Sequence, residues 1–150
     1  TKEDFWKAVA DNIFNLITDQ RKARISVLPD MAEREGIAMI IRFHVRAAAQ
    51  YPEISRLLAQ EACQKSWRIQ YLVKQHIKPG SVYMEKYASK ALNLTPREFA
   101  HWYYIMVSSC ATMFSFEAEC SLLFGFDCRQ DNVIETHSDM LVAMLLAPYP

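Results

Sequence analysis

The sequence predicts an all-α fold, and three observations support this. Apolar residues recur at helical spacing along most of the chain, whereas no segment of useful length alternates apolar and polar residues. Residue pairs typical of helix N-termini, such as Thr95 with Glu98, precede the apolar runs. No Asn-Gly or Asp-Gly pair marks a hairpin turn. We therefore expect about seven helices joined by short turns, in one domain spanning residues 1–150.

The first predicted helix begins at Thr1, where Asp4 completes a capping box, and runs to about Thr18. Its apolar face comprises Phe5, Val9, Ile13, Leu16 and Ile17. The segment Gln20–Leu28 follows and stops at Pro29. Because it carries Arg21, Lys22 and Arg24 with Asp19 nearby, we interpret it as a solvated connector or a frayed helix end, not as a nucleic-acid patch.

Four further helices are predicted before residue 93. Asp30 with Glu33 is expected to cap the first of them, and Ser66 the third, while Pro79-Gly80 is expected to end the third. The predicted ranges are Met31–Gln50, Pro52–Cys63, Trp67–Ile77 and Val82–Leu92.

A long helix, Thr95–Gly125, is the most informative segment. Thr95 is its N-cap, Pro96 occupies the first helical position, and Gly125 can close it with positive φ. It would contain about 29 residues and extend roughly 43 Å. Its apolar residues lie on every side, so it must be buried on every side, and we expect a second chain to cover part of it. Asp131 is expected to cap the final helix, which ends at Leu146.

Charge is unevenly distributed. The formal net charge is zero, which argues against nucleic-acid binding by these residues themselves. Residues 1–90 hold 15 Lys and Arg and 10 Asp and Glu, whereas residues 91–150 hold two and seven. The last third therefore offers little to an anionic partner and suits burial or self-association.

The cysteines Cys63, Cys110, Cys120 and Cys128 form no CxxC pair, so the sequence predicts neither a zinc site nor any other metal site. The longest nearly uncharged run, Trp102–Phe116, is too short to span a bilayer. The N-terminal segment Thr1–Asp11 is charged and amphipathic, unlike a signal peptide. We expect a cytoplasmic protein without a membrane partner.

Three segments resemble one protein family. Thr1-Lys2-Glu3-Asp4-Phe5 resembles the string with which TetR-family transcriptional regulators leave their helix-turn-helix and enter the ligand-binding domain. Arg42–Ala62 resembles the second core helix of that domain and the Pro-initiated helix after it, and Val133–Leu146 resembles its closing helix. The resemblance covers essentially the whole chain, although each local motif is loose.

The resemblance implies a TetR-like C-terminal domain whose last two helices form a four-helix bundle with the same pair of a second subunit. It implies an effector-sensing and dimerisation domain of a regulator, a repressor, that binds a small hydrophobic or aromatic effector. DNA would be a partner only through an N-terminal helix-turn-helix domain that this chain lacks, and no cofactor or enzymatic activity is implied. On this reading, effector binding swings the first helix and changes the spacing of the DNA-reading heads.

Aromatic and sulfur side chains on several helices are the candidate ligand-binding residues, because ligand sites are mostly apolar with a few placed polar groups. For any one of them, core packing is the simpler interpretation, and the hypothesis concerns the group. The candidates are Phe43, His44, Trp67, Tyr71, Tyr87, Trp102, Tyr103, Met106, Cys110 and Met113.

The expected dimer interface lies on the last two predicted helices. Its candidate residues are Phe114, Glu117, Leu122, His137, Met140, Leu141 and Met144. For Glu117, a helix end that becomes exposed to solvent is the simpler interpretation. For His137, a hydrogen-bonded interface position is preferred over a metal ligand.

Two other classes of function stay open at this point. The Glu98-x-x-His101 spacing matches one half of a di-iron bundle motif, so a metal- or haem-dependent helical enzyme with Glu98, His101 or His44 as ligands is the main alternative. No second such motif occurs, and Glu98 already has a capping role. The other alternative is a dimerisation module that binds no ligand.

Overall fold

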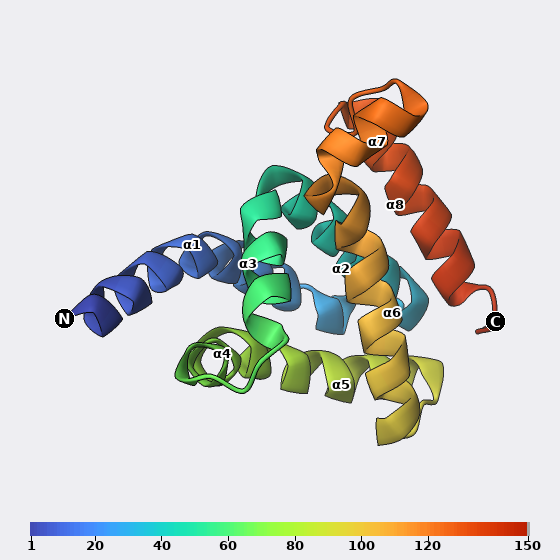
Figure 1. Cartoon of the computed structure of the whole chain (residues 1–150). Coiled ribbons are helices and arrows are strands. Elements are labelled where there is room, and N and C mark those ends of the chain that lie inside the picture. The colour runs from blue at the N-terminus through green and yellow to red at the C-terminus, as the bar shows by residue number, and fades with distance from the viewer. Residues whose placement is uncertain (150) are drawn as a thin grey trace.

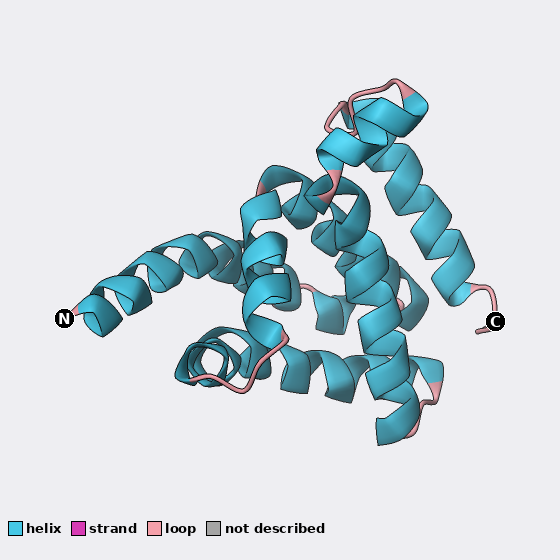
Figure 2. Ribbon diagram, in the orientation of Figure 1, coloured by secondary structure: helices cyan, strands magenta, loops and turns pink. Residues whose placement is uncertain are grey.

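The computed structural model describes residues 1–149, which form only helices and short loops (Figure 2). The all-α prediction is thereby confirmed for this range. A 3₁₀ turn, Leu28–Asp30, and a π-helical segment, Val73–Ile77, accompany the α-helices. The α-helices are α1 (Lys2–Ile25), α2 (Glu33–Gln50), α3 (Pro52–Ala62), α4 (Trp67–Leu72), α5 (Lys78–Leu92), α6 (Pro96–Ser115), α7 (Glu117–Phe124) and α8 (Asp131–Leu146).

The helix α2 forms the centre of the fold and packs against α6 and α8 (Figure 1). A main hydrophobic cluster joins α2, α5, α6 and α8, and includes the fully buried Ile37, Met106 and Phe114. A smaller second cluster joins α1, α3 and α4 around Phe14. The first turns of α1 lie at the far side of the molecule from α8 (Figure 1). Because Ile25 packs on the main cluster, the two halves of α1 contact different parts of the core.

Local capping signals were read correctly at three helix starts. At α6, the Glu98 amide donates to Thr95 Oγ1 at 3.3 Å and the Thr95 amide donates to Glu98 Oε2 at 2.8 Å. Thr1 and Asp4 form the same reciprocal box at α1. Ser66 accepts from the Ile69 amide at α4. These bonds depend on residues three apart, so the sequence alone specifies them.

Two other predicted caps are wrong. The helix α2 begins at Glu33 after Ala32, without a side-chain cap, because Asp30 belongs to the 3₁₀ turn. Asp131 is the first residue of α8 and does not cap it. The end of α1 was also placed too early, since α1 continues through the expected connector to Ile25.

The predicted helix Thr95–Gly125 is divided at Phe116, whose φ of −107° and ψ of 37° leave helical geometry. The break starts α7 in a new direction, and Glu117 at its start pairs with Arg56 of α3 and Arg129. Gly125 ends α7 at a φ of +73°, the left-handed conformation predicted for it.

Pro79 and Gly80 do not end a helix, contrary to the prediction. Pro79 lies in the first turn of α5, where the amide that proline lacks has no obligatory partner. The chain reaches it through the π-helical segment, in which the Lys78 amide donates to the Val73 carbonyl five residues earlier. The helices α4 and α5 are therefore nearly continuous.

Candidate functional site

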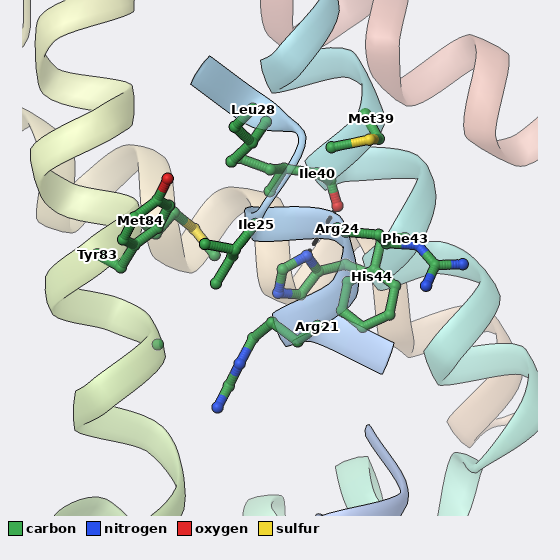
Figure 3. Close-up of a pocket in the computed structure, with 11 residues that line it drawn as sticks. Arg21, Arg24, Ile25, Leu28, Met39, Ile40, Phe43, His44, Tyr83 and Met84 are labelled. Atoms are coloured by element: carbon green, nitrogen blue, oxygen red, sulfur yellow. Dashed lines mark hydrogen bonds between the residues drawn. The ribbon is translucent and has the colours of Figure 1, made fainter. Parts of the chain in front are cut away.

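A cavity of about 30 Å³ lies where the last turns of α1 meet α2 and α5 (Figure 3). It has room for about one or two water molecules, far less than the roughly 300–1,000 Å³ typical of small-molecule sites. An organic ligand could enter only if the surrounding helices moved apart. The lining residues are Arg21, Arg24, Ile25, Leu28, Met39, Ile40, Phe43, His44, Gly80, Tyr83 and Met84.

Gly80 allows the α1 side of this cavity to approach α5 closely. A Cβ atom at Gly80 would lie 2.5 Å from Nη1 of Arg21, so the guanidinium occupies the space that any other residue would fill. Gly80 is buried within α5, and its lack of a Cβ leaves this space to the flexible end of the Arg21 side chain.

The polar groups of the cavity are cationic or neutral. Burial lowers the pKa of the Arg21 guanidinium. Burial and, to a smaller extent, the charge of Arg21 also lower the pKa of His44, which is therefore neutral near pH 7. His44 Nδ1 donates to the Ile40 carbonyl at 2.8 Å, which leaves Nε2 as an acceptor. Tyr103 lies near Arg21, and burial raises the pKa of its phenol.

A groove of about 320 Å³ adjoins the cavity on the outer side of α2. Arg24, Met39 and Phe43 line both spaces, and the Arg24 guanidinium stacks 4.7 Å from the centre of the Phe43 ring. Two other groove arginines pair with α8: Arg42 with Asp139 at 2.7 Å, and Arg46 with both carboxylate oxygens of Glu135. The remaining groove residues are Met31, Glu35 and Ala38.

The ten predicted ligand-binding residues are divided among three places. Phe43 and His44 line the cavity, and Tyr103 lies beside Arg21. Trp67 and Tyr71 belong to a separate aromatic group with Trp6 on α1. The others lie in or against the main hydrophobic cluster, namely Tyr87, Trp102, Met106, Cys110 and Met113. Among these, the Tyr87 hydroxyl and the Trp102 indole nitrogen are buried without a hydrogen-bond partner within residues 1–149.

The α1 side of the cavity was not predicted from the sequence. Arg21 and Arg24 were assigned to a solvated connector because three bases stand close together. A signal was nevertheless present, since Arg21, Arg24, Ile25 and Leu28 are spaced as i, i+3, i+4 and i+7, which is one helical face. The α5 side, with Gly80, Tyr83 and Met84, could not be assigned without knowing which helices meet.

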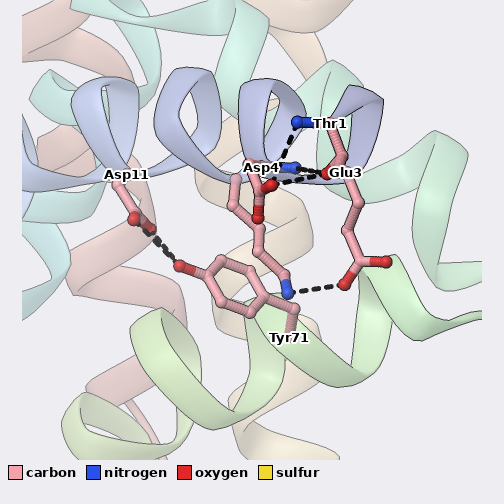
Figure 4. Close-up of polar contacts among 6 residues, drawn as sticks. Thr1, Glu3, Asp4, Asp11 and Tyr71 are labelled. Atoms are coloured by element: carbon pink, nitrogen blue, oxygen red, sulfur yellow. Dashed lines mark hydrogen bonds and ion pairs between the residues drawn. The ribbon is translucent and has the colours of Figure 1, made fainter.

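A second polar cluster holds the other half of α1. The Tyr71 hydroxyl donates to both oxygens of Asp11 at 2.8 Å (Figure 4), and His76 Nε2 lies 2.7 Å from Asp11 Oδ1. His76 is buried and its ring stacks on Phe14 at 4.9 Å. Since His76 lies in the π-helical segment, this network, named here the Asp11 cluster, joins α1 to the segment that leads into α5.

Exposed apolar residues lie on each of α6, α7 and α8, and together they are named here the α6–α8 surface. It includes Tyr104, Ile105, Phe116, Leu122, Leu123, Phe124, Met140 and Met144, each more than half exposed. Between Glu98 and Glu117 the chain contains no charged residue. The exposed side of α6 is thus one of the apolar sides for which the sequence predicted a covering chain.

Three of the predicted interface residues, Leu122, Met140 and Met144, lie on this surface. Phe114 and Leu141 instead belong to the main hydrophobic cluster inside the protomer, with exposures of 0% and 7%. They are therefore not available to a partner. Glu117 is held by Arg56 and Arg129, and His137 Nε2 lies 2.8 Å from the Ser109 carbonyl.

Within residues 1–149, no three His, Cys, Asp or Glu side chains are placed to hold a metal ion, and Glu98 is engaged in its cap. The described helices include none with the length and apolarity needed to cross a membrane. The comparisons with protein families, curated proteins and solved structures gave no match to this chain.

Proposed function

We propose that this chain is the effector-sensing and dimerisation domain of a TetR-like DNA-binding transcriptional regulator, acting as a repressor. The observation that carries the proposal is the position of the cavity beneath the C-terminal half of α1. A molecule that enlarges this cavity must displace α1 from α2 or α5, because the closed volume admits little more than water. The site therefore couples occupancy to the position of one helix.

The N-terminal half of α1 suits the role of a connection to a DNA-binding head. Phe5 and Val9 are exposed on one face of it, where a further domain could pack. An effector would shift the equilibrium only by as much as it prefers the displaced position of α1 to the position described here. Release of DNA then requires tighter effector binding to the displaced form.

A second copy of the chain is the occupant proposed for the α6–α8 surface. A two-fold axis would place α6 and α8 of one protomer against the same helices of the other, which gives a four-helix arrangement. The helices α6 and α8 supply the uncharged stretch and the exposed Tyr104, Ile105, Met140 and Met144, so one self-complementary contact would cover these residues. This agrees with the charge asymmetry of the sequence.

The experiment that tests the sensing role measures the position of α1 directly. A spin label at Lys2→Cys, in a Cys63→Ser background, reports the distance between the two α1 helices of a dimer, and a label at Glu119→Cys in α7 is the matched control. Addition of octanoate, 1-octanol or indole should change the Lys2 distance and leave the Glu119 distance unchanged. A chain that is monomeric, or whose bound ligand moves neither label, would contradict the proposal.

The small volume of the cavity favours one other candidate, a dimerisation module that binds no ligand. That function predicts the same dimer and the same α6–α8 interface. It also predicts that none of the three compounds changes the melting temperature or either distance. The two candidates therefore differ in one measurable property.

A further inference from the structure

The cavity carries positive charge that nothing in the described chain neutralises. Among residues 1–149, no carboxylate lies within ion-pair distance of Arg21 or Arg24, although the nearby Arg42 and Arg46 each have one. The hydrogen bond from Arg24 Nη1 goes to the Gln20 carbonyl, 3.1 Å away on the same helix. Both arginines are partly buried, so water compensates them only in part.

No other group at the cavity alters this balance. His44 is neutral and faces Arg21, and the phenol of Tyr103 stays protonated. Glu35 lines the adjoining groove but not the cavity. Arg21 is thus a half-buried guanidinium that approaches α5 because Gly80 leaves room for it, and no carboxylate among the described residues pairs with it.

The rest of the lining is apolar. Ile25, Leu28, Ile40 and Met84 line the space with apolar side chains (Figure 3). An arginine fork matches a carboxylate in two parallel hydrogen bonds, and such bonds are stronger than those between neutral groups. The lining therefore suits a molecule with one anionic end and an apolar body.

We propose that the effector is an amphipathic organic acid, whose carboxylate binds the Arg21 guanidinium and whose apolar body lies against Ile40 and Met84. This inference rests on the proposed function and specifies its ligand class. Arg24 and Phe43 line both the cavity and the groove of about 320 Å³, so an apolar body that displaces α1 can extend from the cavity into the groove. The volume of the groove falls within the range of small-molecule sites.

The test compares three molecules that share an eight-carbon chain and differ in the charge of the head: octanoate, 1-octanol and octyltrimethylammonium. Calorimetric titration of the whole chain measures each dissociation constant. We expect octanoate to bind at least about tenfold more tightly than octanol, since a hydrogen-bonded charge pair is worth that much or more. The ammonium compound should bind more weakly than both.

Two substitutions at neighbouring positions distinguish an effect of the charge at the cavity on octanoate binding from an effect of the total charge of the protein. Arg21→Gln removes the proposed contact, whereas Lys22→Gln removes one positive charge from an exposed position on the same helix. Arg21→Gln should weaken octanoate binding by at least about tenfold and leave octanol binding within about twofold, and Lys22→Gln should change neither. Arg21→Lys, which keeps the charge, should retain part of the preference and guards against loss of folding in Arg21→Gln.

The outcomes distinguish this inference from the proposed function. Equal or tighter binding of octanol, or an octanoate preference that survives in Arg21→Gln, overturns the organic-acid assignment and leaves an effector site of other chemistry. If none of the three compounds binds but the chain is a dimer, the assignment fails and the ligand-free module is favoured. If none binds and the chain is a monomer, both proposals fail.

Discussion

The Asp11 cluster should fasten α1 to the body of the protein, and substitutions within it give a graded prediction. Tyr71→Phe removes one hydrogen bond to a carboxylate, a contact worth about 1.5–3 kcal/mol when it is well shielded. The Asp11 side chain is 39% exposed, so water replaces part of the lost bond. We therefore expect Tyr71→Phe to lower the free energy of unfolding by about 1 kcal/mol.

Asp11→Ala should have a larger effect than Tyr71→Phe. It removes the acceptor of both Tyr71 and His76, and His76 is only 7% exposed, so its ring nitrogen is left buried without a partner. The expected loss is about 2–3 kcal/mol, because an unsatisfied buried polar group adds its desolvation cost to the lost bonds. The matched control is Asp19→Ala on the same helix. The Asp19 side chain is 85% exposed, and its carboxylate makes only a long ion pair of 3.9 Å with Lys22, so we expect the free energy of unfolding to fall by less than about 0.5 kcal/mol.

Urea denaturation followed by circular dichroism measures these differences, and amide hydrogen exchange locates them. If the cluster holds α1, exchange should accelerate in the first half of α1 and in the π-helical segment before it does so in α6. Equal stability of Asp11→Ala and Asp19→Ala, together with unchanged exchange in α1, would refute the reasoning. It would mean that the apolar contacts of Phe14 alone hold the helix.

Three further predictions follow from the same structure. Met144→Arg, at an exposed position of the α6–α8 surface, should convert a dimer to a folded monomer by sedimentation velocity, whereas Leu141→Arg should unfold the protomer because Leu141 is buried. The pKa of His44 lies below its ordinary value of 6.5, so as the pH falls the unfolded chain takes up a proton at His44 at a higher pH than the folded chain does. The free energy of unfolding should therefore decrease as the pH falls below 6.5, and His44→Gln should remove that part of the pH dependence measured by urea denaturation. Burial raises the pKa of Cys110 to about 12, so iodoacetamide at about pH 8 should label the exposed Cys63 and spare Cys110 in the native protein, as mass spectrometry would show, and labelling of Cys110 at the same rate would contradict its burial.

The sequence predicted helices well where the signal is local and poorly where it is not. The pair Thr95 and Glu98 specifies a helix start through bonds between residues three apart, and the structure contains those bonds. The break at Phe116 has no such signal. The break accompanies ion pairs of Glu117 with Arg129 and with Arg56, which lies on α3. The break therefore depends on the tertiary arrangement and cannot be read from the local sequence.

The site was less predictable than the fold for a related reason. His44 and Phe43 are among the aromatic and sulfur side chains that the sequence offers as candidates, and both line the cavity. Trp67 and Tyr71 met the same criterion but pack on α1 at the second cluster. Composition shows which residues could line a pocket, whereas the choice among them depends on which helices meet. Gly80 illustrates this, because its role depends on Arg21, which is 59 positions away in the sequence.

The two polar contacts of α1 together determine how a ligand at the cavity would move it. Asp11 is ten residues from Arg21 and nine from Lys2, so Arg21 lies about 15 Å along the helix on one side of Asp11 and Lys2 about 14 Å on the other. An acid that draws Arg21 away from Gly80 loosens one contact and leaves the Asp11 cluster intact. The helix should then pivot at Asp11, and its N-terminus should move by about as much as Arg21 does, in the opposite direction.

A pivot of α1 at Asp11 predicts that ligand binding and the movement of α1 can be separated by substitution. Asp11→Ala removes the Asp11 cluster, at which α1 would pivot, and leaves the cavity unchanged. Octanoate should therefore bind with a dissociation constant within about threefold of the wild type. The distribution of Lys2 spin-label distances should nevertheless broaden, and octanoate should no longer shift it. Asp19→Ala should keep both the affinity and the shift. A normal shift in Asp11→Ala would show that α1 moves as a free arm, and a large loss of affinity there would show that the Asp11 cluster and the cavity are one cooperative unit, not two separate contacts on one helix.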